Sequence, residues 1–463
     1  MAAPSSSSSS AVLSPPPLPV GDGHDAPNWV LLDILGYMGD YHTATGLAES
    51  NTSTDERIQV SFCTARPPQV SQLCVRCPDL GPAAFVVPPK VISADSDLIL
   101  FQVSVCPQVR FNLRYCDYFL YRAHLPKSSL DLLPHPYPDN NFKDQEVALL
   151  SLGNDGQYAV AALTRRYQDM TPTTEFDLYL YRSSEPQQGW TSKVLSVAEP
   201  LRDKLCPVDF APYHDTTKVI ILGHGKVGWV DLWRGILVCN VLDVYPVLHD
   251  IPLPLPARGN RKFYYKCSAL VIRDITVNLL EASIKYIEIA NPREKVVSPD
   301  HSSDSSVRQK QRRAPSRAWK ATTWSRPIQI DSREDWHRDC TFDVADIIID
   351  SMHSEQLPSL RSTGDSPSEA TLPAHLIGFP TMSMDDDVFF LLYMASRVGY
   401  KDVVVSIDMK KNTVQGFANL ATGRDFTFPR ICTSEISKYL SKDEGTKEAS
   451  ETNIWSYMQE FDQ

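Results

Sequence analysis

A glycine-rich motif is the sharpest chemical signal in this sequence. Gly223, Gly225 and Gly228 have the GxGxxG spacing and follow the strand-like run Lys218–Leu222. In a dinucleotide site such glycines let the backbone approach a pyrophosphate at a helix N-terminus, and an acid about 20 residues later binds the ribose. Asp243 stands at that distance, but the intervening residues WVDLWRGILVCNVL contain a further glycine and no helical pattern. We therefore predict a hairpin here and no bound cofactor.

Three cysteines have a spacing that could supply thiolates to zinc. Cys63, Cys74 and Cys77 form C-x10-C-x2-C. A structural zinc site needs a fourth ligand, usually from a second close pair, and none follows nearby. The histidines form no HxH or HExxH pair. We expect buried or idle thiols and no metal.

The run DWHRDC at 335–340 places an imidazole, a thiol and carboxylates close together in sequence. Such neighbours form a catalytic group only if the fold brings nucleophile, base and orienting group together in space. We expect instead a surface turn anchored by Trp336. The acids at 385–387 lack the spacing of a calcium loop and are expected to close a hairpin. No catalytic residue is predicted.

A basic cluster is the one candidate binding site that the sequence offers. It comprises Arg308, Lys310, Arg312 and Arg313, within a polar, Ser-rich stretch. Import machinery or an acidic partner could read these cations, whereas the plainer interpretation is a solvated linker.

The elements between these motifs have a hydrophobic period of two. Ile58, Val60 and Phe62 alternate with polar residues, as half-buried strands do. Turn-forming residues separate such runs at 154–156, 234–235, 385–387 and 410–412. Helical spacing occurs only near the end, at Ile436 and Leu440 and again in 454–461. The pattern predicts an all-β fold with short C-terminal helices.

A loose internal repeat favours one particular all-β architecture. Aromatic strands end in Tyr121-Arg122 and again in Tyr181-Arg182, each before a short closing strand. Repeats of about four strands are typical of β-propeller blades. We predict a β-propeller-like array of antiparallel sheets, with the Trp229–Trp233 region in its core and the blade number open. Stacked β-sandwiches are the alternative.

Composition divides the chain into a domain and three polar stretches. Residues 1–27 form a Ser/Pro-rich head that we expect to be disordered, and 28–441 form the propeller-like domain. A disordered basic, Ser-rich insertion is expected at 293–318, and 442–463 is a tail with a short amphipathic helix.

Charge and cysteine content limit the partners and the compartment. The net charge of −11 argues against general nucleic-acid binding, which needs a surplus of Lys and Arg. The longest apolar run, Val388–Ala395, is far below the roughly 18 residues of a membrane span. Ten cysteines are too few for a disulfide scaffold. We expect a soluble protein of the cytoplasm or nucleus.

Several segments resemble a known family. They are NWVLLDILGYMGD, QVSFCTARPPQVSQLCVRCP, VGWVDLWRGILVCNVL with HDIPLPLP, AWKATTWSRP and IDMKKNTVQGFANL. In that order they resemble the plant domain of unknown function 1618, a family expanded in grasses, over about Trp29 to Leu440. The family has no established activity, cofactor or catalytic residues. Its resemblance to kelch-like domains beside plant F-boxes implies a propeller-like interaction module, although Asn28–Asp40 does not have the length or Leu-Pro entry of an F-box.

These observations predict a non-enzymatic module that binds a protein partner through loops at one end of the propeller. The alternative is a hydrolase-like enzyme or small-molecule binder with a pocket at the channel. Buried carboxylates or histidines converging at the channel mouth would indicate the enzyme.

Overall fold

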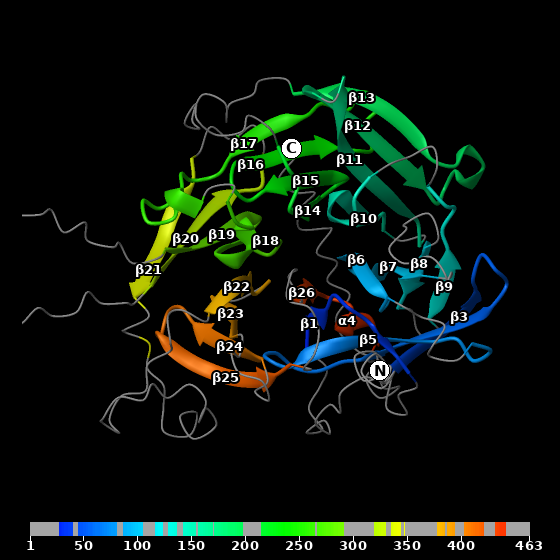
Figure 1. Ribbon diagram of the computed structural model, residues 1–463, viewed down its shortest axis with the longest axis horizontal. Coiled ribbons are helices and arrows are strands. Elements are labelled where there is room, and N and C mark those ends of the chain that lie inside the picture. The colour runs from blue at the N-terminus through cyan, green and yellow to red at the C-terminus, as the bar shows by residue number, and fades with distance from the viewer. Residues whose placement is uncertain are drawn as a thin grey trace, which may run out of the picture.

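The protein is a six-bladed β-propeller (Figure 1). The computed structural model describes residues 27–39, 45–80, 87–104, 116–123, 128–136, 142–153, 156–169, 171–197, 214–263, 266–290, 319–329, 335–343, 347, 377–384, 387–393, 402–420 and 431–440. The predicted head, insertion and tail at 1–27, 293–318 and 442–463 lie almost wholly outside these residues. Among the described residues, no helix is long and apolar enough to cross a membrane.

Five blades are four-stranded antiparallel sheets, in chain order from the inside outward. Blade 1 has β6 (Lys90–Asp95), β7 (Leu98–Ser104), β8 (Cys116–Arg122) and β9 (Ser129–Leu132). Blade 2 has β10 (Val147–Ser151), β11 (Tyr158–Gln168), β12 (Thr171–Arg182) and β13 (Thr191–Ser196). Blade 3 has β14 (Lys218–Gly223), β15 (Lys226–Asp231), β16 (Gly235–Asn240) and β17 (His249–Pro252). Blade 4 has β18 (Arg273–Asn278), β19 (Ser283–Ala290), β20 (Lys320–Pro327) and β21 (His337–Asp343). Blade 5 has β22 (Ile377–Met382), β23 (Val388–Tyr393), β24 (Val403–Asp408) and β25 (Thr413–Asn419).

The sixth, closing blade joins the two ends of the described chain. Its order is β26 (Ile431–Ser434), β1 (Val30–Asp33), β5 (Val70–Arg76), β4 (Arg57–Cys63) and β3 (Thr45–Asn51), and β2 (Tyr37–Met38) also pairs with β5. β26 is antiparallel to β1, whereas β1 is parallel to β5. The last strand is therefore hydrogen-bonded beside the first, which closes the ring.

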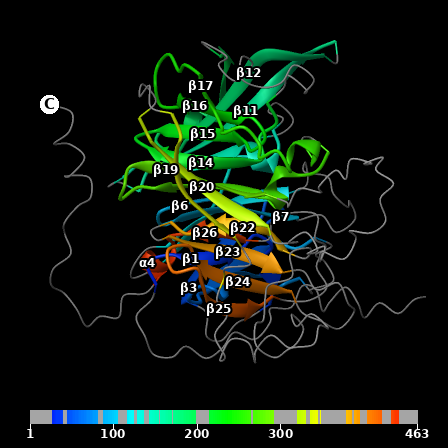
Figure 2. The same ribbon diagram turned by 90° about the vertical axis from the view of Figure 1, so that its left-hand side faces the viewer.

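The C-terminal helix α4 (Ser437–Leu440) packs on this closing blade (Figure 2). Ile436 and Leu440 are buried in one cluster with Val30 and Leu32 of β1. The helical spacing of Ile436 and Leu440 is thus confirmed, although the helix is a single turn. The helical pattern expected at 454–461 lies outside the described residues.

The ring confirms the propeller prediction and rules out stacked sandwiches. Neighbouring innermost strands contact one another from β6 through β10, β14, β18 and β22 to β26. The predicted repeat is real, because Tyr121-Arg122 and Tyr181-Arg182 end the third strands of blades 1 and 2. Each arginine donates to a turn of the next blade, Arg122 to Gly156 O between β10 and β11 and Arg182 to Leu242 O between β16 and β17.

The expected turns connect strands as the sequence indicated. Residues 232–234 separate β15 from β16, which begins at Gly235, and 409–412 separate β24 from β25 with Asn412 at φ 52°. Trp229 and Trp233 are buried as predicted, with 0% and 5% of their surface exposed. The Trp229 indole donates to Glu146 O at 2.8 Å and thereby joins blade 3 to blade 2.

Four antiparallel strands return the chain to the side on which it entered a blade. All connections between blades therefore lie on one side of the ring, which we call the linker face. The turns within each first and last strand pair lie on the other side, which we call the turn face. The linker face carries the 253–272 connection between blades 3 and 4, in which the candidate site lies.

Candidate interaction surface

A run of exposed cations marks the connection between β17 and β18. Arg258, Arg261, Lys262 and Lys266 are all exposed, and the sequence has no Asp or Glu between Asp250 and Asp274. None of these cations forms an ion pair with another described residue. We call residues 258–263 and 266 the basic segment. In a chain with a net charge of −11 it is a local positive patch.

The backbone of the basic segment is held by a buried asparagine. Asn260 is 0% exposed, and its side-chain amide donates to Glu288 Oε1 at 2.7 Å and to Ile289 O at 2.8 Å. Its own N–H donates to Ala257 O, and the Phe263 N–H donates to Asn260 O at 2.9 Å. These bonds form the 3-10 turn Arg261–Phe263, so cationic side chains on it point outward from a fixed backbone.

Glu288 of β19 is the centre of this anchor. It forms an ion pair with Arg273 of β18, with 3.0 Å between Arg273 Nη2 and Glu288 Oε1. The Ala257 N–H donates to both carboxylate oxygens, at 3.1 and 3.2 Å. A buried charge is costly unless it is paired and hydrogen-bonded. Here Arg273 pairs with the charge, and the bonds from Ala257 and Asn260 hold the chain that leads into the basic segment.

Trp233 completes the anchor from blade 3. Arg273 donates through Nη1 to Leu232 O at 2.7 Å, and its guanidinium lies 4.7 Å from the centre of the Trp233 ring. The Trp233 indole N–H donates to Cys267 O at 3.2 Å, directly after the basic segment. Trp233 therefore ties the far end of the segment to the same buried arginine.

The β15–β16 turn that presents Trp233 has a fixed geometry. Asp231 Oδ1 accepts the Trp233 N–H at 2.9 Å, and Oδ2 accepts the Asp215 N–H at 3.0 Å. A Cβ on Gly235 would stand 2.5 Å from Ile251 O, so the close approach of β16 to β17 requires glycine. The block WVDLWRGIL is thus the support of the basic segment.

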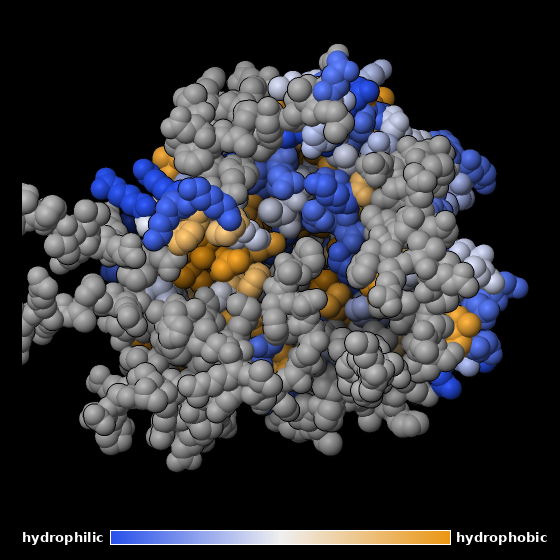
Figure 3. Space-filling view, viewed as in Figure 1, coloured by the Kyte–Doolittle hydropathy of each residue, from blue (hydrophilic) through white to orange (hydrophobic). Residues whose placement is uncertain are grey.

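Apolar side chains lie beside the cations. Leu255 is 53% exposed just before the segment, and the Lys262 ammonium lies 5.1 Å from the centre of the Phe263 ring. In Figure 3, hydrophilic surface borders a hydrophobic area over β18–β20. The surface therefore offers both charge and apolar contact to a partner.

Carboxylates on the innermost strands bind neighbouring blades rather than a common pocket. Asp274 of β18 accepts from Lys218 Nζ of β14 at 2.7 Å and from the Met382 N–H of β22 at 3.0 Å. Asp95 of β6 accepts the Ser151 N–H of β10 at 2.7 Å. Burial raises the pKa of Asp95 to about 6.

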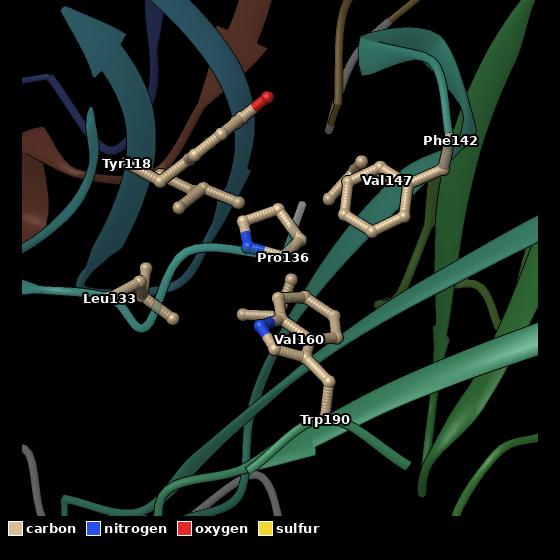
Figure 4. A pocket seen from close by; sticks show the side chains of 8 residues that line it. Tyr118, Leu133, Pro136, Phe142, Val147, Val160 and Trp190 are labelled. Atoms are coloured by element: carbon tan, nitrogen blue, oxygen red, sulfur yellow. The ribbon is translucent and has the colours of Figure 1, made fainter. Parts of the chain in front are cut away.

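Two cavities lie away from the axis. One, of about 10 Å³, lies between blades 1 and 2 and is apolar, and it is too small for more than about one water (Figure 4). Its lining residues are Leu100, Tyr118, Leu133, Pro136, Phe142, Val147, Val160 and Trp190. The other is a cleft of about 530 Å³ between β3 and β9, lined by Leu47, Glu49, Ser128, Ser129 and Leu130. It has room for a ligand, but Glu49 is the one titratable side chain in that lining.

The glycine motif is a hairpin, as predicted. β14 ends at Gly223 and β15 begins at Lys226, so no helix follows the motif. Gly223, His224 and Gly225 have φ values of 81°, 51° and 75°. All three residues are therefore in the left-handed region, and the backbone forms a tight turn where a nucleotide-binding motif would begin a helix.

The structure also shows what surrounds the three cysteines and Asp387. Cys63, Cys74 and Cys77 are buried free thiols, and among the described residues no group of three His, Cys, Asp or Glu side chains could hold a metal ion. Asp387 pairs with Lys285 at 3.6 Å and with Lys410 beside the β22–β23 hairpin. The predicted basic cluster Arg308, Lys310, Arg312 and Arg313 lies outside the described residues.

The surface turn expected at 335–340 is wrong for most of the run, because residues from His337 onward form β21. Trp336 is an anchor as predicted, with its indole N–H donating to Pro252 O at 2.8 Å. His337 contacts Asp339 at 3.2 Å, whereas Cys340 contacts Thr323 Oγ1 of β20 at 3.0 Å. The thiol and the imidazole thus have different partners.

Sequence reasoning missed the basic segment, although a signal was present. Successive cations are one to four positions apart, so they do not form the compact run that marks 308–313. The informative feature is the complete absence of acids between Asp250 and Asp274. Because no acid lies near them in the sequence, the same cations predict a patch of positive charge.

The segment that contains this site matches a known family. Residues 229–390 match the model described as "Protein of unknown function (DUF1618)". Over this part of its length the chain is similar to that family. The matched DUF1618 segment begins at Trp229 and includes the WVDLWRGIL block, the basic segment and both members of the Arg273–Glu288 pair. No curated protein matches the chain.

Solved structures resemble this chain only loosely. The Penicillium chrysogenum alpha-L-arabinanase complexed with arabinobiose is 10% identical, with a TM-score of 0.27 over 88% of this chain and 97% of that one. The WD40 domain of SCAP from fission yeast is 10% identical, with a TM-score of 0.31 over 82% of this chain and 74% of that one. At such scores the likeness supports no conclusion about activity or binding.

Proposed function

We propose that this protein is a non-enzymatic propeller module that binds another protein through its linker face. The carrying observation is the basic segment, whose exposed cations have no ion-pair partner among the described residues while its backbone is fastened to a buried ion pair. Loops on a rigid scaffold are where propellers present binding residues. Because the segment is already ordered, little conformational entropy is lost when a partner binds it.

A hydrolase-like enzyme remains the alternative, and it needs titratable groups that converge on one pocket. Among the described residues, Asp95 and Glu146 are the carboxyls whose pKa is raised by burial. Glu146 accepts from Thr164 Oγ1 at 2.8 Å and from the Lys143 N–H at 2.9 Å, and Asp95 accepts from Ser151. These contacts hold local backbone and side chains, which favours the binding module.

The proposed compartment is the cytoplasm or nucleus. All the cysteines among the described residues are free thiols, including the exposed Cys267. Disulfides form and persist mainly in oxidising compartments, so free thiols favour a reducing one.

Affinity purification of the tagged full chain tests the proposed function. The extract is treated with nuclease, and recovered proteins are quantified by mass spectrometry against an unrelated tagged propeller. We expect at least one protein that binds again when both components are purified, with hydrogen-exchange protection over 255–271. Failure to find any such protein would refute the proposal. A version without residues 293–318 shows whether the predicted basic cluster contributes.

A further inference from the structure

Among the described residues, no carboxylate forms an ion pair with a cation of the basic segment. The carboxylate of the anchor, Glu288, already pairs with Arg273, and Asp274 of β18 pairs with Lys218. On the described surface, the basic segment therefore presents four cations without an ion-pair partner, namely Arg258, Arg261, Lys262 and Lys266. Such a concentration of one sign attracts the opposite sign and fixes the orientation of a partner.

One of these cations is already oriented. Arg261 donates through Nε to the Pro256 carbonyl at 3.2 Å, which restrains its side chain. Its terminal guanidinium nitrogens have no partner among the described residues. A planar guanidinium with both terminal nitrogens available binds a carboxylate in a bidentate manner. The site thus suits a carboxylate better than a diffuse anionic surface.

Apolar side chains beside the cations further restrict the chemical class of the partner. Leu255 is 53% exposed, and Phe263 lies under the Lys262 ammonium. A purely ionic ligand would leave this apolar surface in water, whereas a peptide with both acidic and apolar side chains would cover it. Nucleic acid is disfavoured because the chain as a whole carries a charge of −11.

We propose that the basic segment binds an acidic peptide segment of a partner protein, with Asp or Glu side chains on the four cations and apolar side chains on Leu255 and Phe263. This inference rests on the proposed function and names the chemistry of the partner.

The test is fluorescence anisotropy with the full chain and two labelled probes. One probe is a short peptide of alternating Glu and Leu, and its matched control has Gln in place of every Glu. We expect binding of the acidic peptide alone, weakened by added salt because exposed charges are screened. Equal binding of both peptides, or no binding of either, would overturn the inference.

Matched variants locate the binding site. The quadruple variant Arg258→Gln, Arg261→Gln, Lys262→Gln and Lys266→Gln is expected to bind the acidic peptide at least about tenfold more weakly. The control variant Arg57→Gln, Lys143→Gln, Lys193→Gln and Lys320→Gln removes as many exposed cations elsewhere and should bind as the wild type does. Equal losses in both variants would refute a localised site. The replaced side chains are exposed, so unchanged thermal unfolding shows that both variants fold.

Two further outcomes are decisive. Labelled single-stranded RNA that binds more tightly than the acidic peptide, and is lost in the basic-segment variant, would overturn the inference in favour of a nucleic-acid site. A partner from the affinity purification that binds the quadruple variant as tightly as the wild type would also overturn it, while leaving the proposed protein-binding function intact.

Discussion

The Arg273 guanidinium and the Glu288 carboxylate form a fully buried ion pair, 3.0 Å apart, with side-chain exposures of 0% and 1%. Each charge has further partners, because Leu232 O accepts from Arg273 while Asn260 and Ala257 donate to Glu288. The pair therefore does more than neutralise charge. It connects the β15–β16 turn of blade 3, two strands of blade 4 and the start of the basic segment.

Breaking this pair should destabilise the protein strongly. Arg273→Met leaves Glu288 buried without its cation, and we expect a loss of about 3–5 kcal/mol in the free energy of unfolding. Urea unfolding followed by tryptophan fluorescence measures it. Lys320→Met removes an exposed partner of Asp343 and should cost under about 1 kcal/mol. Similar losses in the two variants would show that the buried pair contributes no more to the free energy of unfolding than an exposed pair does.

Gly235→Ala tests the close approach of β16 and β17. The new Cβ would stand 2.5 Å from Ile251 O, a backbone atom that moves only with its strand, so we expect a loss of about 1–3 kcal/mol. Gly416→Ala is the control, since its Cβ would meet Pro68 Cγ at an ordinary 3.4 Å. Thermal unfolding should show a lower Tm for the first variant and little change for the second. A neutral Gly235→Ala would contradict this explanation of the WVDLWRGIL block.

Local pattern was sufficient to predict the blades but not their closure. Alternation such as Ile58, Val60 and Phe62 identifies strands, and residues such as Arg234-Gly235 identify turns, because both depend on neighbours in sequence. The pairing of β1 with β26 joins opposite ends of the chain, and the parallel pairing of β1 with β5 has no turn to mark it. The number of blades depends on that closure, so the sequence alone does not predict it.

The candidate site was harder to predict for the same reason. The cations from Arg258 to Lys266 are visible in the sequence, but what makes them a site is a fixed backbone. Asn260 is held by Glu288, 28 residues away, and Trp233 binds the Cys267 carbonyl, 34 residues away. Strand pairing in blade 4 brings these groups together, and no local pattern reports it. The cations at 308–313 are at most two positions apart, so the sequence alone marks them as a cluster.

Asp95 should give the stability of the protein a measurable pH dependence. Its pKa is raised from 3.8 to about 6, chiefly by burial, and the Ser151 N–H, Ser96, Asp97 and Glu435 face it. The folded state then holds a proton that the unfolded state has released, so this group's contribution falls as pH rises from about 4 to 6 and stays low above that. Asp95→Asn keeps an acceptor for Ser151 without the charge.

Relative to the wild type, Asp95→Asn should therefore gain about 2–3 kcal/mol in the free energy of unfolding between about pH 4 and pH 7. Urea unfolding of both proteins at several pH values measures the difference between their free energies of unfolding. The contributions of the other titrating groups cancel in that difference. A difference that does not vary with pH would contradict the raised pKa.

Trp233→Phe tests whether the indole orders the basic segment. The phenyl ring can still lie over Arg273, but Cys267 O loses its donor. The N–H groups of Lys266 and Cys267, which donate to Phe263 O, should then exchange with solvent about three- to tenfold faster. Trp336→Phe is the matched control, since it removes an indole bond to Pro252 O in the same region. Hydrogen exchange read by mass spectrometry should show faster exchange at 266–267 in Trp233→Phe alone, with weaker binding of the acidic peptide. Unchanged exchange would mean that Asn260 suffices to hold the segment.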